Sequence, residues 1–292
     1  MAPELYGRGA EAERVMTGRV EGKVAFITGA ARGQGRSHAV LLASEGASII
    51  ATDVSRQVAT VPYATASSDD LTETVRLVEA AGGRIIAEDA DVRDLPTMRD
   101  VVNRGVAEFG QLDIVIANAG ISAPAPTLEM SEEMWNTTID VNLTGVWKTI
   151  KASVPHVISA GRGGSVVITS SLAAMKASEH TAHYSASKAG LVGLMRTLAH
   201  ELAPHKIRVN AVCPTTVGTA MIKNDALYRL FRPDLENPTF DDCAPGLEGL
   251  NIMPVSTIDC RDVSNAIAWL VSDEARWVTG VALPIDAGST AK

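Results

Sequence analysis

The chain has 292 residues, of which 46% are apolar and 21% are charged, and its formal net charge is −8. This ordinary globular composition excludes a disordered chain, a coiled coil and a collagen-like fibre. The 34 Asp and Glu outnumber the 26 Lys and Arg, which argues against a nucleic-acid-binding protein, because such proteins normally carry a basic excess. The 24 glycines and the four each of Phe, Trp and Tyr favour an α/β fold with tight turns over a β-sandwich.

The amino-terminal segment 1–20 is polar and lacks the apolar core of a signal peptide, so we expect a flexible arm and a cytoplasmic protein. Met16 is an alternative start to Met1, because the periodic sequence begins only after it. No apolar run approaches the roughly 18 residues that a membrane span requires. Three widely spaced cysteines predict reduced thiols rather than a metal site.

Apolar, β-rich runs alternate with amphipathic helical runs along the chain. The first strand, 23–28, ends in a Gly-rich turn, and the helix after it stops at Gly46. A second strand, 47–52, leads into a polar stretch, 55–69, which is long for a strand-to-helix loop. The pattern then predicts, in order, a helix over 69–81, a strand over 84–88, a helix over 95–109, a strand over 112–117, a helix over 131–159, a strand over 165–169, a helix over 182–202, a strand over 207–212, a helix over 261–271 and a strand over 281–285.

Most of these strands are apolar on both faces, as in a parallel sheet covered by helices on both sides. The sequence therefore predicts a single α/β domain over 21–292, built on a doubly wound parallel sheet. Two segments interrupt the alternation. We name the polar stretch 55–69 the insertion and the irregular, proline-rich stretch 219–256 the lid, because the latter is expected to cover the carboxyl edge of the sheet.

The turn after the first strand has the pattern TGxxxGxG. Glycine lets the backbone approach a pyrophosphate, and the helix N-terminus offers free N–H groups and a positive dipole end. The turn follows a strand, opens a helix and is followed 20 residues past Gly33 by an acid, Asp53, so we expect it to bind a dinucleotide. The turn residues expected to do so are Gly29, Arg32, Gly33, Gln34 and Gly35.

Asp53 at the end of the second strand is expected to accept hydrogen bonds from the adenosine ribose hydroxyls. Its charge would repel a 2′-phosphate, so we predict NAD rather than NADP as the cofactor. Arg32 argues the other way, because a basic residue in this turn can meet a 2′-phosphate. Asp53 carries more weight in the prediction, because it lies at the ribose.

Tyr184 and Lys188 lie four residues apart on a predicted helix and therefore share one face. An ammonium one turn away favours the phenolate, so we expect the Tyr184 pKa to fall from its reference value near 10 toward the working pH. An exposed helical pair is the other interpretation of this spacing. The position downstream of a dinucleotide turn favours an acid/base pair.

With these motifs, the sequence from 22 to 288 resembles the short-chain dehydrogenase/reductase family. The resemblance implies a Rossmann fold, a homotetramer and no metal. It also implies a hydrogen bond from Ser171 to the substrate oxygen, since the family spacing of 13 residues before the tyrosine selects Ser171 over Ser170. In the family, Tyr184 takes the hydroxyl proton, Lys188 binds the nicotinamide ribose, and Asn142 holds a water that links Lys188 to solvent. The resemblance also places Tyr184, like Lys188, at the nicotinamide ribose. Further cofactor contacts implied by the family pattern are Asp91, Val92, Asn118, Ala119, Gly120, Pro214 and Thr219.

A narrower resemblance is to the carveol-dehydrogenase-type, mycofactocin-associated subgroup. It rests on the turn and helix start over 29–40, on the insertion, and on the run 213–216, where Thr215 replaces the glycine of the family pattern. In that subgroup the insertion is expected to cover the adenosine side of NAD, so that the cofactor scarcely exchanges and an external redox carrier reoxidises it. The other interpretation of the insertion is a tolerated surface loop.

An apolar helical stretch at 227–231 in the lid suits a hydrophobic secondary alcohol, carveol-like, or its ketone as the substrate. Two other enzymes on the same scaffold, a 3-oxoacyl-thioester reductase and a hydroxysteroid dehydrogenase, would share every catalytic residue. A non-catalytic dinucleotide-sensing protein is a remote alternative, because it would not need the Ser, Tyr and Lys set.

Overall fold

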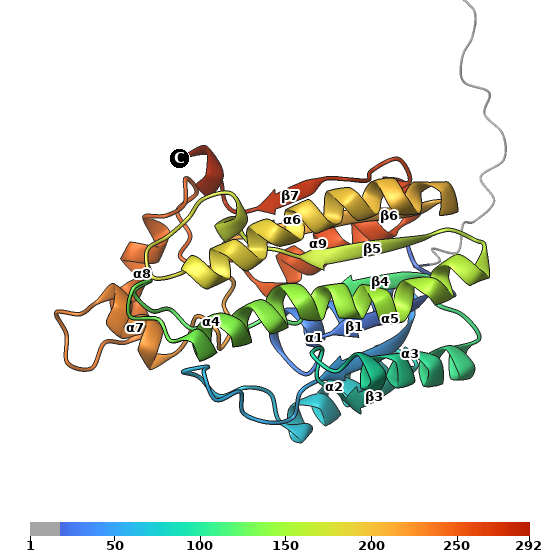
Figure 1. Cartoon of the computed structure of the whole chain (residues 1–292), viewed down its shortest axis with the longest axis horizontal. Helices are drawn as coiled ribbons and strands as arrows, with labels where there is room; N and C mark the ends of the chain where they lie inside the picture. The colour runs from blue at the N-terminus through green and yellow to red at the C-terminus, as the bar shows by residue number, and fades with distance from the viewer. Residues whose placement is uncertain (1–17) are drawn as a thin grey trace, which may run out of the picture.

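The computed structural model describes residues 18–292 and contains one seven-stranded parallel sheet in the order β3-β2-β1-β4-β5-β6-β7 (Figure 1). The chain starts in the middle of the sheet, builds outward to β3, then crosses back to β4 and continues to β7. The strand order therefore reverses between β1 and β4, and in such sheets ligands bind at that reversal, outside the carboxyl ends of the strands. The strands are β1 (Val24–Thr28), β2 (Ser48–Asp53), β3 (Ile85–Asp89), β4 (Ile114–Ala117), β5 (Gly164–Thr169), β6 (Ile207–Pro214) and β7 (Ala282–Ile285).

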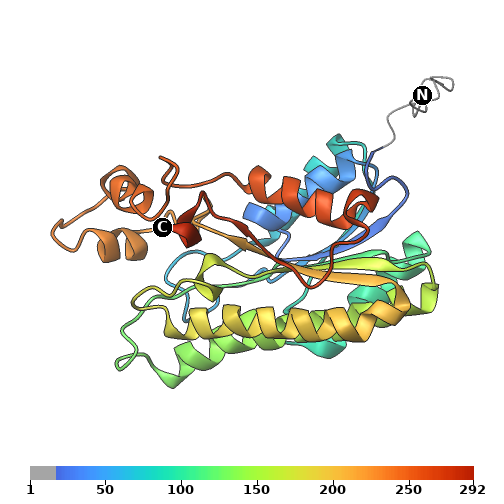
Figure 2. The ribbon, with the colours of Figure 1, turned by 90° about the horizontal axis from the view of Figure 1, so that it is seen from above.

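Helices cover both faces of the sheet, with α1, α2 and α9 on one face and α3, α5 and α6 on the other (Figure 2). The two smaller helices α7 and α8 lie apart from these layers, at the carboxyl edge of the sheet (Figure 1). The helices are α1 (Gly33–Ser44), α2 (Ser68–Ala80), α3 (Leu95–Phe109), α4 (Glu132–Ile139), α5 (Gly145–Ala160), α6 (Ala182–Leu202), α7 (Asp225–Phe231), α8 (Phe240–Glu248) and α9 (Cys260–Val271).

The hydrophobic core has two parts, one on each face of the sheet. Strand β1 serves both, because its side chains alternate: Phe26 packs toward α3, α5 and α6, whereas Ala25 and Ile27 pack toward α1 and α9. All five residues of β1 are buried. The predicted doubly wound parallel sheet with helices on both faces is confirmed.

Two expectations about the elements need correction. The single helix expected over 131–159 is divided by a π-helical turn at Asp140–Thr144 into α4 and α5, because one extra residue per turn does not disturb an apolar pattern enough to be seen in the sequence. The lid is not wholly irregular, since it contains α7 and α8.

The first 17 residues of the expected arm 1–20 lie outside the described residues. Its last residues already belong to the folded part, because Val20 is buried and Arg19 forms an ion pair with Glu45 at 2.7 Å. Within 18–292, no helix is both long and apolar enough to cross a membrane.

Candidate active site

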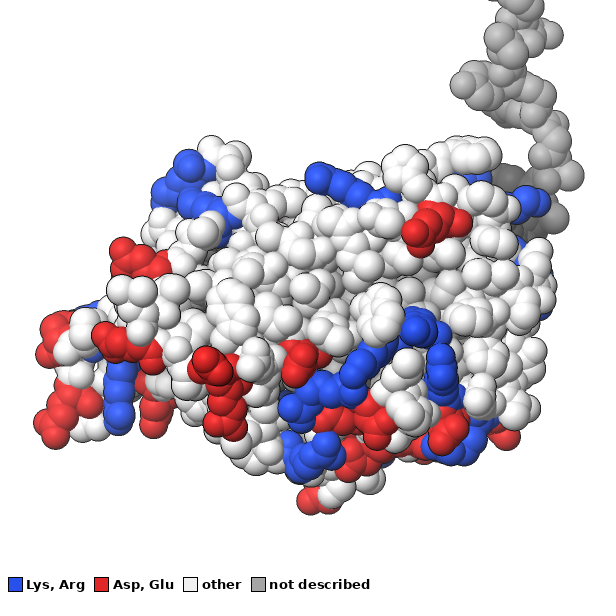
Figure 3. Space-filling model, in the orientation of Figure 1, with Lys and Arg blue, Asp and Glu red and all other residues white. Residues whose placement is uncertain are grey.

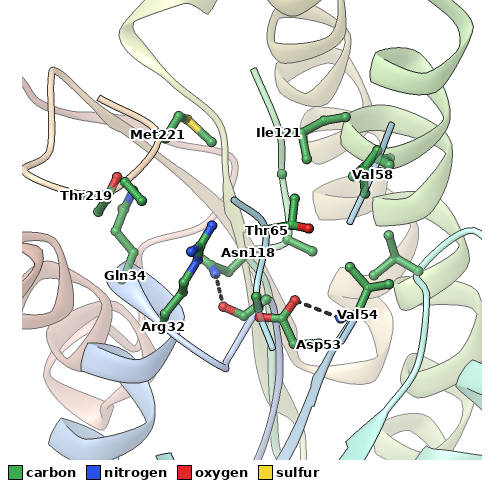
Figure 4. A pocket seen from close by; sticks show the side chains of 18 of the residues that line it. Arg32, Gln34, Asp53, Val54, Val58, Thr65, Asn118, Ile121, Thr219 and Met221 are labelled. Atoms are coloured by element: carbon green, nitrogen blue, oxygen red, sulfur yellow. Dashed lines mark hydrogen bonds between the residues drawn. The ribbon is translucent and has the colours of Figure 1, made fainter. Parts of the chain in front are cut away.

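Two cavities adjoin at the carboxyl edge of the sheet. The first, of about 360 Å³, lies between the β1–α1 turn, the end of β2 and the insertion (Figure 4). The second, of about 500 Å³, lies between the ends of β5 and β6, the start of α6 and the lid. The residues that line both cavities are Gln34, Asn118, Gly120, Thr219 and Met221.

Two glycines of the β1–α1 turn allow close backbone packing beside the first cavity, which Gly29 lines. A Cβ on Gly29, whose φ is +67°, would lie 2.8 Å from Ala119 Cα, and a Cβ on Gly35 would lie 2.0 Å from the Gly29 carbonyl oxygen. Only glycine fits at either position. Arg32 occupies the N-cap of α1, and its guanidinium has no acceptor to offer the N–H groups of the helix. The first N–H groups of α1 therefore have no side-chain cap.

Asp53 ends β2 beside this turn, close to Arg32 (Figure 4). Its two carboxylate oxygens accept hydrogen bonds from the backbone N–H groups of Ala31 at 2.9 Å and Val54 at 2.8 Å. Burial raises the pKa of Asp53, although these hydrogen bonds and the charge of Arg32 oppose the rise. The Arg32 guanidinium donates a hydrogen bond to the Ala64 carbonyl and is thereby engaged with the insertion.

Asn118 joins the ends of two strands. Its side-chain N–H groups donate to the carbonyls of Thr28 at 3.0 Å and Gly29 at 3.2 Å, and its carbonyl accepts from the Thr169 hydroxyl at 3.3 Å. The residue thus holds the β1–α1 turn against the ends of β4 and β5. Ala119 and Gly120, which follow it, line the first cavity as expected of cofactor-binding positions.

Asp91 lines the first cavity, but two arginines already hold its carboxylate. Arg93 contacts it at 2.7 Å and Arg56, from the insertion, at 2.8 Å. Burial alone would raise the pKa of Asp91, but the Arg93 hydrogen bonds and the Arg56 charge lower it. Asp91 therefore fastens the insertion to the turn between β3 and α3, a role that the sequence did not reveal. Val92 is buried and lines the same cavity.

One glutamine side chain organises the insertion. Gln57 Nε2 donates to the carbonyls of Val58, Val61 and Tyr63, each at 3.1 Å, and Gln57 Oε1 accepts from the Thr65 N–H at 3.0 Å. The Gln57 amide therefore contacts four backbone groups of the loop, with its two N–H groups shared among the three carbonyls. These hydrogen bonds make the insertion an ordered segment rather than a flexible surface loop.

The two ends of this loop lie together, because the Thr65 hydroxyl donates to the Arg56 carbonyl at 2.9 Å. Between them, Val58 and Val61 are buried in the core. Tyr63 lines the first cavity, and burial raises its pKa to about 12. The last two residues of 55–69 form the start of α2 rather than loop.

The second cavity contains the predicted acid/base pair. Lys188 is buried and donates to the Thr169 carbonyl at 2.9 Å, with its Nζ 5.5 Å from the centroid of the Tyr184 ring. Burial lowers the pKa of Lys188 to about 8. Burial also raises the pKa of Tyr184, although a hydrogen bond with Ser171 opposes the rise. The expected lowering of the Tyr184 pKa is therefore absent, because desolvation of the phenol outweighs the hydrogen bond with Ser171.

The two adjacent serines at the end of β5 have different partners. The Ser170 hydroxyl is buried and donates to the Lys188 carbonyl at 2.9 Å. The Ser171 hydroxyl caps a short 3-10 turn by accepting from the Ala173 N–H at 3.1 Å, and it reaches Tyr184. Ser170 thus supports α6, whereas Ser171 shares a cavity wall with the phenol.

Asn142 lies in the π-helical turn and is fully buried. Its amide accepts from the Ile121 N–H at 2.8 Å and donates to the Ile121 carbonyl at 2.9 Å. A Cβ on Gly120 would lie 3.3 Å from Lys188 Nζ and 3.5 Å from Asn142 Oδ1, so both groups border the space that Gly120 leaves without a side chain. The geometry brings Asn142 to the lysine end of the pair.

After β6, the chain accommodates Thr215 where the family pattern has glycine. Its N–H donates to the Ile285 carbonyl at 3.1 Å and its hydroxyl to Asn251 Oδ1 at 3.1 Å. These bonds attach the end of β6 to β7 and to the lid. Pro214 and Thr219 remain on the wall of the second cavity.

The lid supplies an apolar wall opposite the polar groups. The sequence predicts that the apolar stretch 227–231 faces the substrate, and its Leu227, Leu230 and Phe231 line the cavity. It missed Leu247 and Leu250, because the prolines around them hide the helical spacing of α8. Among residues 18–292, no group of three or more His, Cys, Asp or Glu side chains is placed to hold a metal ion.

Known proteins match this chain over most of its length. The sequence profile of the short chain dehydrogenase family matches residues 23–227. The (−)-trans-carveol dehydrogenase of Rhodococcus erythropolis is 51% identical over 275 residues, which cover 94% of this chain and 99% of the relative.

Two solved structures are also similar to this chain. The crystal structure of carveol dehydrogenase from Mycobacterium avium in complex with NAD has a TM-score of 0.93 and 53% identity, covering 94% of this chain and all of that one. A short chain dehydrogenase from Mycobacterium paratuberculosis bound to NAD has a TM-score of 0.86 and 45% identity, with the same coverage.

Proposed function

The chain belongs to the short-chain dehydrogenase/reductase family, and on that premise we propose that it is an NAD-dependent oxidoreductase of hydrophobic secondary alcohols and their ketones, of the carveol type. One observation carries the proposal. A cavity that has the features of a dinucleotide site opens onto a second cavity with Ser171, Tyr184 and Lys188 on one wall and an apolar lid on another. The carveol-dehydrogenase relatives, at 51% and 53% identity, favour this substrate class over an acyl thioester or a steroid.

The residues of the first cavity fit NAD. The bare backbone of Gly29 and Gly33, which line this cavity, and the uncapped start of α1 suit a pyrophosphate. Each Asp53 oxygen accepts one backbone hydrogen bond and keeps a further acceptor site for a ribose hydroxyl. A 2′-phosphate beside this carboxylate would be repelled, and Arg32 is engaged with the Ala64 carbonyl, so the pocket favours NAD over NADP.

NAD, when bound, supplies the hydride acceptor for alcohol oxidation and, reduced, the donor for ketone reduction. Tyr184 Oη takes the proton from the substrate hydroxyl during oxidation and returns it during reduction. Ser171 Oγ hydrogen-bonds the substrate oxygen and holds it beside the phenol. Lys188 Nζ binds the nicotinamide ribose, and Asn142 holds a water through which the lysine exchanges protons with solvent.

We further propose that the insertion retains the cofactor, so that an external redox carrier, of the kind that mycofactocin represents, reoxidises it in place. Three contacts support this proposal: Arg56 with Asp91, Arg32 with Ala64, and Tyr63 with Ser122. They attach the insertion to two residues that line the first cavity, Asp91 and Arg32, and to Ser122, which lines the second. Release of a dinucleotide beneath it would require these contacts to open.

Mass spectrometry of the protein purified without added cofactor tests both proposals. We expect about one NAD or NADH per chain to survive dialysis, and alcohol oxidation to proceed with an artificial electron acceptor. An empty protein that binds NAD reversibly and oxidises alcohols with free NAD would reject retention but keep the activity. Bound NADP would contradict the role given to Asp53.

We also propose that the protein is a homotetramer that works in the cytoplasm. The middle of the face over α5 and α6 carries few charged side chains (Figure 3). On this side Trp135 of α4 and Trp147 of α5 remain 40% and 42% exposed. Large exposed apolar groups on such a face suit an interface between copies. Mass photometry of the wild type and of Trp147→Glu tests the assembly, and we expect smaller particles for the variant.

A further inference from the structure

Gln34 lies where the two cavities meet. It is the second residue of α1, and it is one of the residues that line both cavities (Figure 4). Thr219 approaches the same turn from the start of the lid, because a Cβ on Gly33 would lie 3.2 Å from Thr219 Cγ2. The junction is thus bounded by an amide side chain on one side and a threonine on the other.

The amide oxygen of Gln34 is buried but lacks a donor. Among residues 18–292, Oε1 has no hydrogen-bond partner, in contrast to the Asn118 amide nearby, whose donors and acceptor are all engaged. A buried acceptor without a donor is unfavourable, so such groups are normally satisfied by a ligand or by water. We therefore expect Gln34 Oε1 to accept a hydrogen bond from an N–H or O–H group of a ligand at the junction.

The proposed function limits which donor this can be. At the junction with the substrate cavity a dinucleotide presents its nicotinamide end. The ribose hydroxyls there belong to Tyr184 and Lys188, and the substrate hydroxyl belongs to Ser171 and Tyr184. The carboxamide NH₂ on the nicotinamide ring is the donor that remains.

We propose that Gln34 Oε1 accepts a hydrogen bond from the nicotinamide carboxamide NH₂ and, together with Thr219, fixes the rotation of the ring toward the substrate. Gln34 is then a positioning residue for hydride transfer, in addition to being part of the Gly-rich turn. This inference rests on the proposed use of NAD. It assigns the side chain of Gln34 a contact distinct from the backbone contacts that the turn makes with the pyrophosphate.

The test uses a cofactor analogue that lacks the donor. In 3-acetylpyridine adenine dinucleotide a methyl ketone replaces the carboxamide, so the ring carbonyl stays and the N–H groups are lost. The purified full-length protein is incubated to equilibrium with mixtures of NAD and the analogue, desalted and denatured, and the released dinucleotides are quantified by mass spectrometry. The bound ratio reports relative affinity even where exchange is slow, and it needs no turnover.

The variant Gln34→Met keeps the length of the side chain but removes the acceptor, and Gln34→Leu provides a second such change. Thr72→Ala, on the exposed surface of α2, is the matched control. We expect the preference of the wild type for NAD over the analogue to fall roughly tenfold in both Gln34 variants, as loss of one buried hydrogen bond implies, and to be unchanged in the control.

An unchanged preference in Gln34→Met and Gln34→Leu would overturn the inference and leave the proposed function intact. A wild-type protein that bound neither dinucleotide at equilibrium, as equilibrium dialysis measures, would overturn the proposed function and the inference together. Loss of both only on desalting would reject retention alone, and the ratio of the two dinucleotides would then be measured by equilibrium dialysis. The failure of the inference and the failure of the proposed function are therefore distinguishable.

Discussion

Tyr63 Oη accepts a hydrogen bond from the Ser122 N–H at 3.3 Å, which joins the insertion to the loop after β4. The loop after β4 carries Asn118 to Gly120, the residues that separate the two cavities. The insertion therefore spans the first cavity from the end of β2 to the border of the substrate site. Weakening this contact should loosen the insertion while leaving Ser171, Tyr184 and Lys188 unchanged.

Replacing Tyr63 by Phe should speed the release of bound cofactor. The change removes only the hydroxyl, so the buried ring stays, and loss of one hydrogen bond predicts roughly a fivefold faster release. The decay of NADH fluorescence after rapid desalting into a trap for free NADH measures this rate. An unchanged rate with an intact fold would show that the insertion is held elsewhere, and Arg56→Gln, which breaks the ion pair with Asp91, would then be the variant of choice.

Replacing Gln57 by Leu should loosen the insertion itself. The Thr65 N–H and the carbonyls of Val61 and Tyr63 would lose this partner, so we expect hydrogen–deuterium exchange at 58–65 to rise roughly tenfold or more. Gln111→Leu is the matched control, because that amide bonds Gly22 and Asp113, which lie outside the insertion. Equal exchange at 58–65 in the two variants would contradict the role assigned to Gln57.

Replacing Asp53 by Asn should weaken the preference for NAD over NADP. The substitution removes the negative charge while keeping the size of the side chain, so a 2′-phosphate is no longer repelled. Competition between NAD and NADP, with the bound dinucleotide identified by mass spectrometry, gives the ratio. We expect it to fall roughly tenfold or more. The midpoint of thermal unfolding should fall as well, because the Asn NH₂ cannot accept one of the two backbone hydrogen bonds that Asp53 accepts. A ratio that stays constant would mean that another group selects the cofactor.

The buried Lys188 should make stability depend on pH. Its pKa is lowered to about 8 in the folded chain from 10.5 when exposed, so between these values the unfolded chain binds more protons and the free energy of unfolding rises with pH. Below about pH 8 the buried charge costs up to about 3 kcal/mol. Lys188→Met should therefore be more stable than the wild type at pH 7, and the difference should shrink from pH 8 to 10. Urea unfolding at each pH measures it, and a constant difference would contradict the burial of the charge.

The Tyr184 phenol should give the two reaction directions opposite pH profiles. Burial raises its pKa, so the phenolate that accepts the alcohol proton becomes more populated as the pH rises toward and past 10. We expect kcat/KM for alcohol oxidation to increase with pH and kcat/KM for ketone reduction to decrease. Tyr184→Phe should lower kcat by roughly 10²–10⁴-fold while the bound NAD content stays unchanged. A Phe variant with near-normal kcat would exclude Tyr184 as the acid/base.

The sequence was enough to predict the sheet and the family, and it named several residues that line the two cavities. These predictions rest on local patterns: the Gly-rich turn, Asp53 and the spacing of Tyr184 and Lys188. It could not predict contacts that join distant segments. Arg56 meets Asp91 across 35 residues and Tyr63 meets Ser122 across 59. The predicted fall of the Tyr184 pKa was wrong, because burial raises it. Burial depends on the whole fold, which the spacing of Tyr184 and Lys188 does not reveal.

The closure of the insertion by Thr65 on Arg56 has a consequence for protein engineering. Because Arg56 and Thr65 are in contact, a short turn should be able to replace residues 57–64 between them without changing the distance between β2 and α2. If the insertion retains the cofactor as we propose, exchanging this segment between relatives would change how firmly the cofactor is held and leave the substrate cavity under the lid unchanged. Cofactor retention and substrate choice could then be altered one at a time.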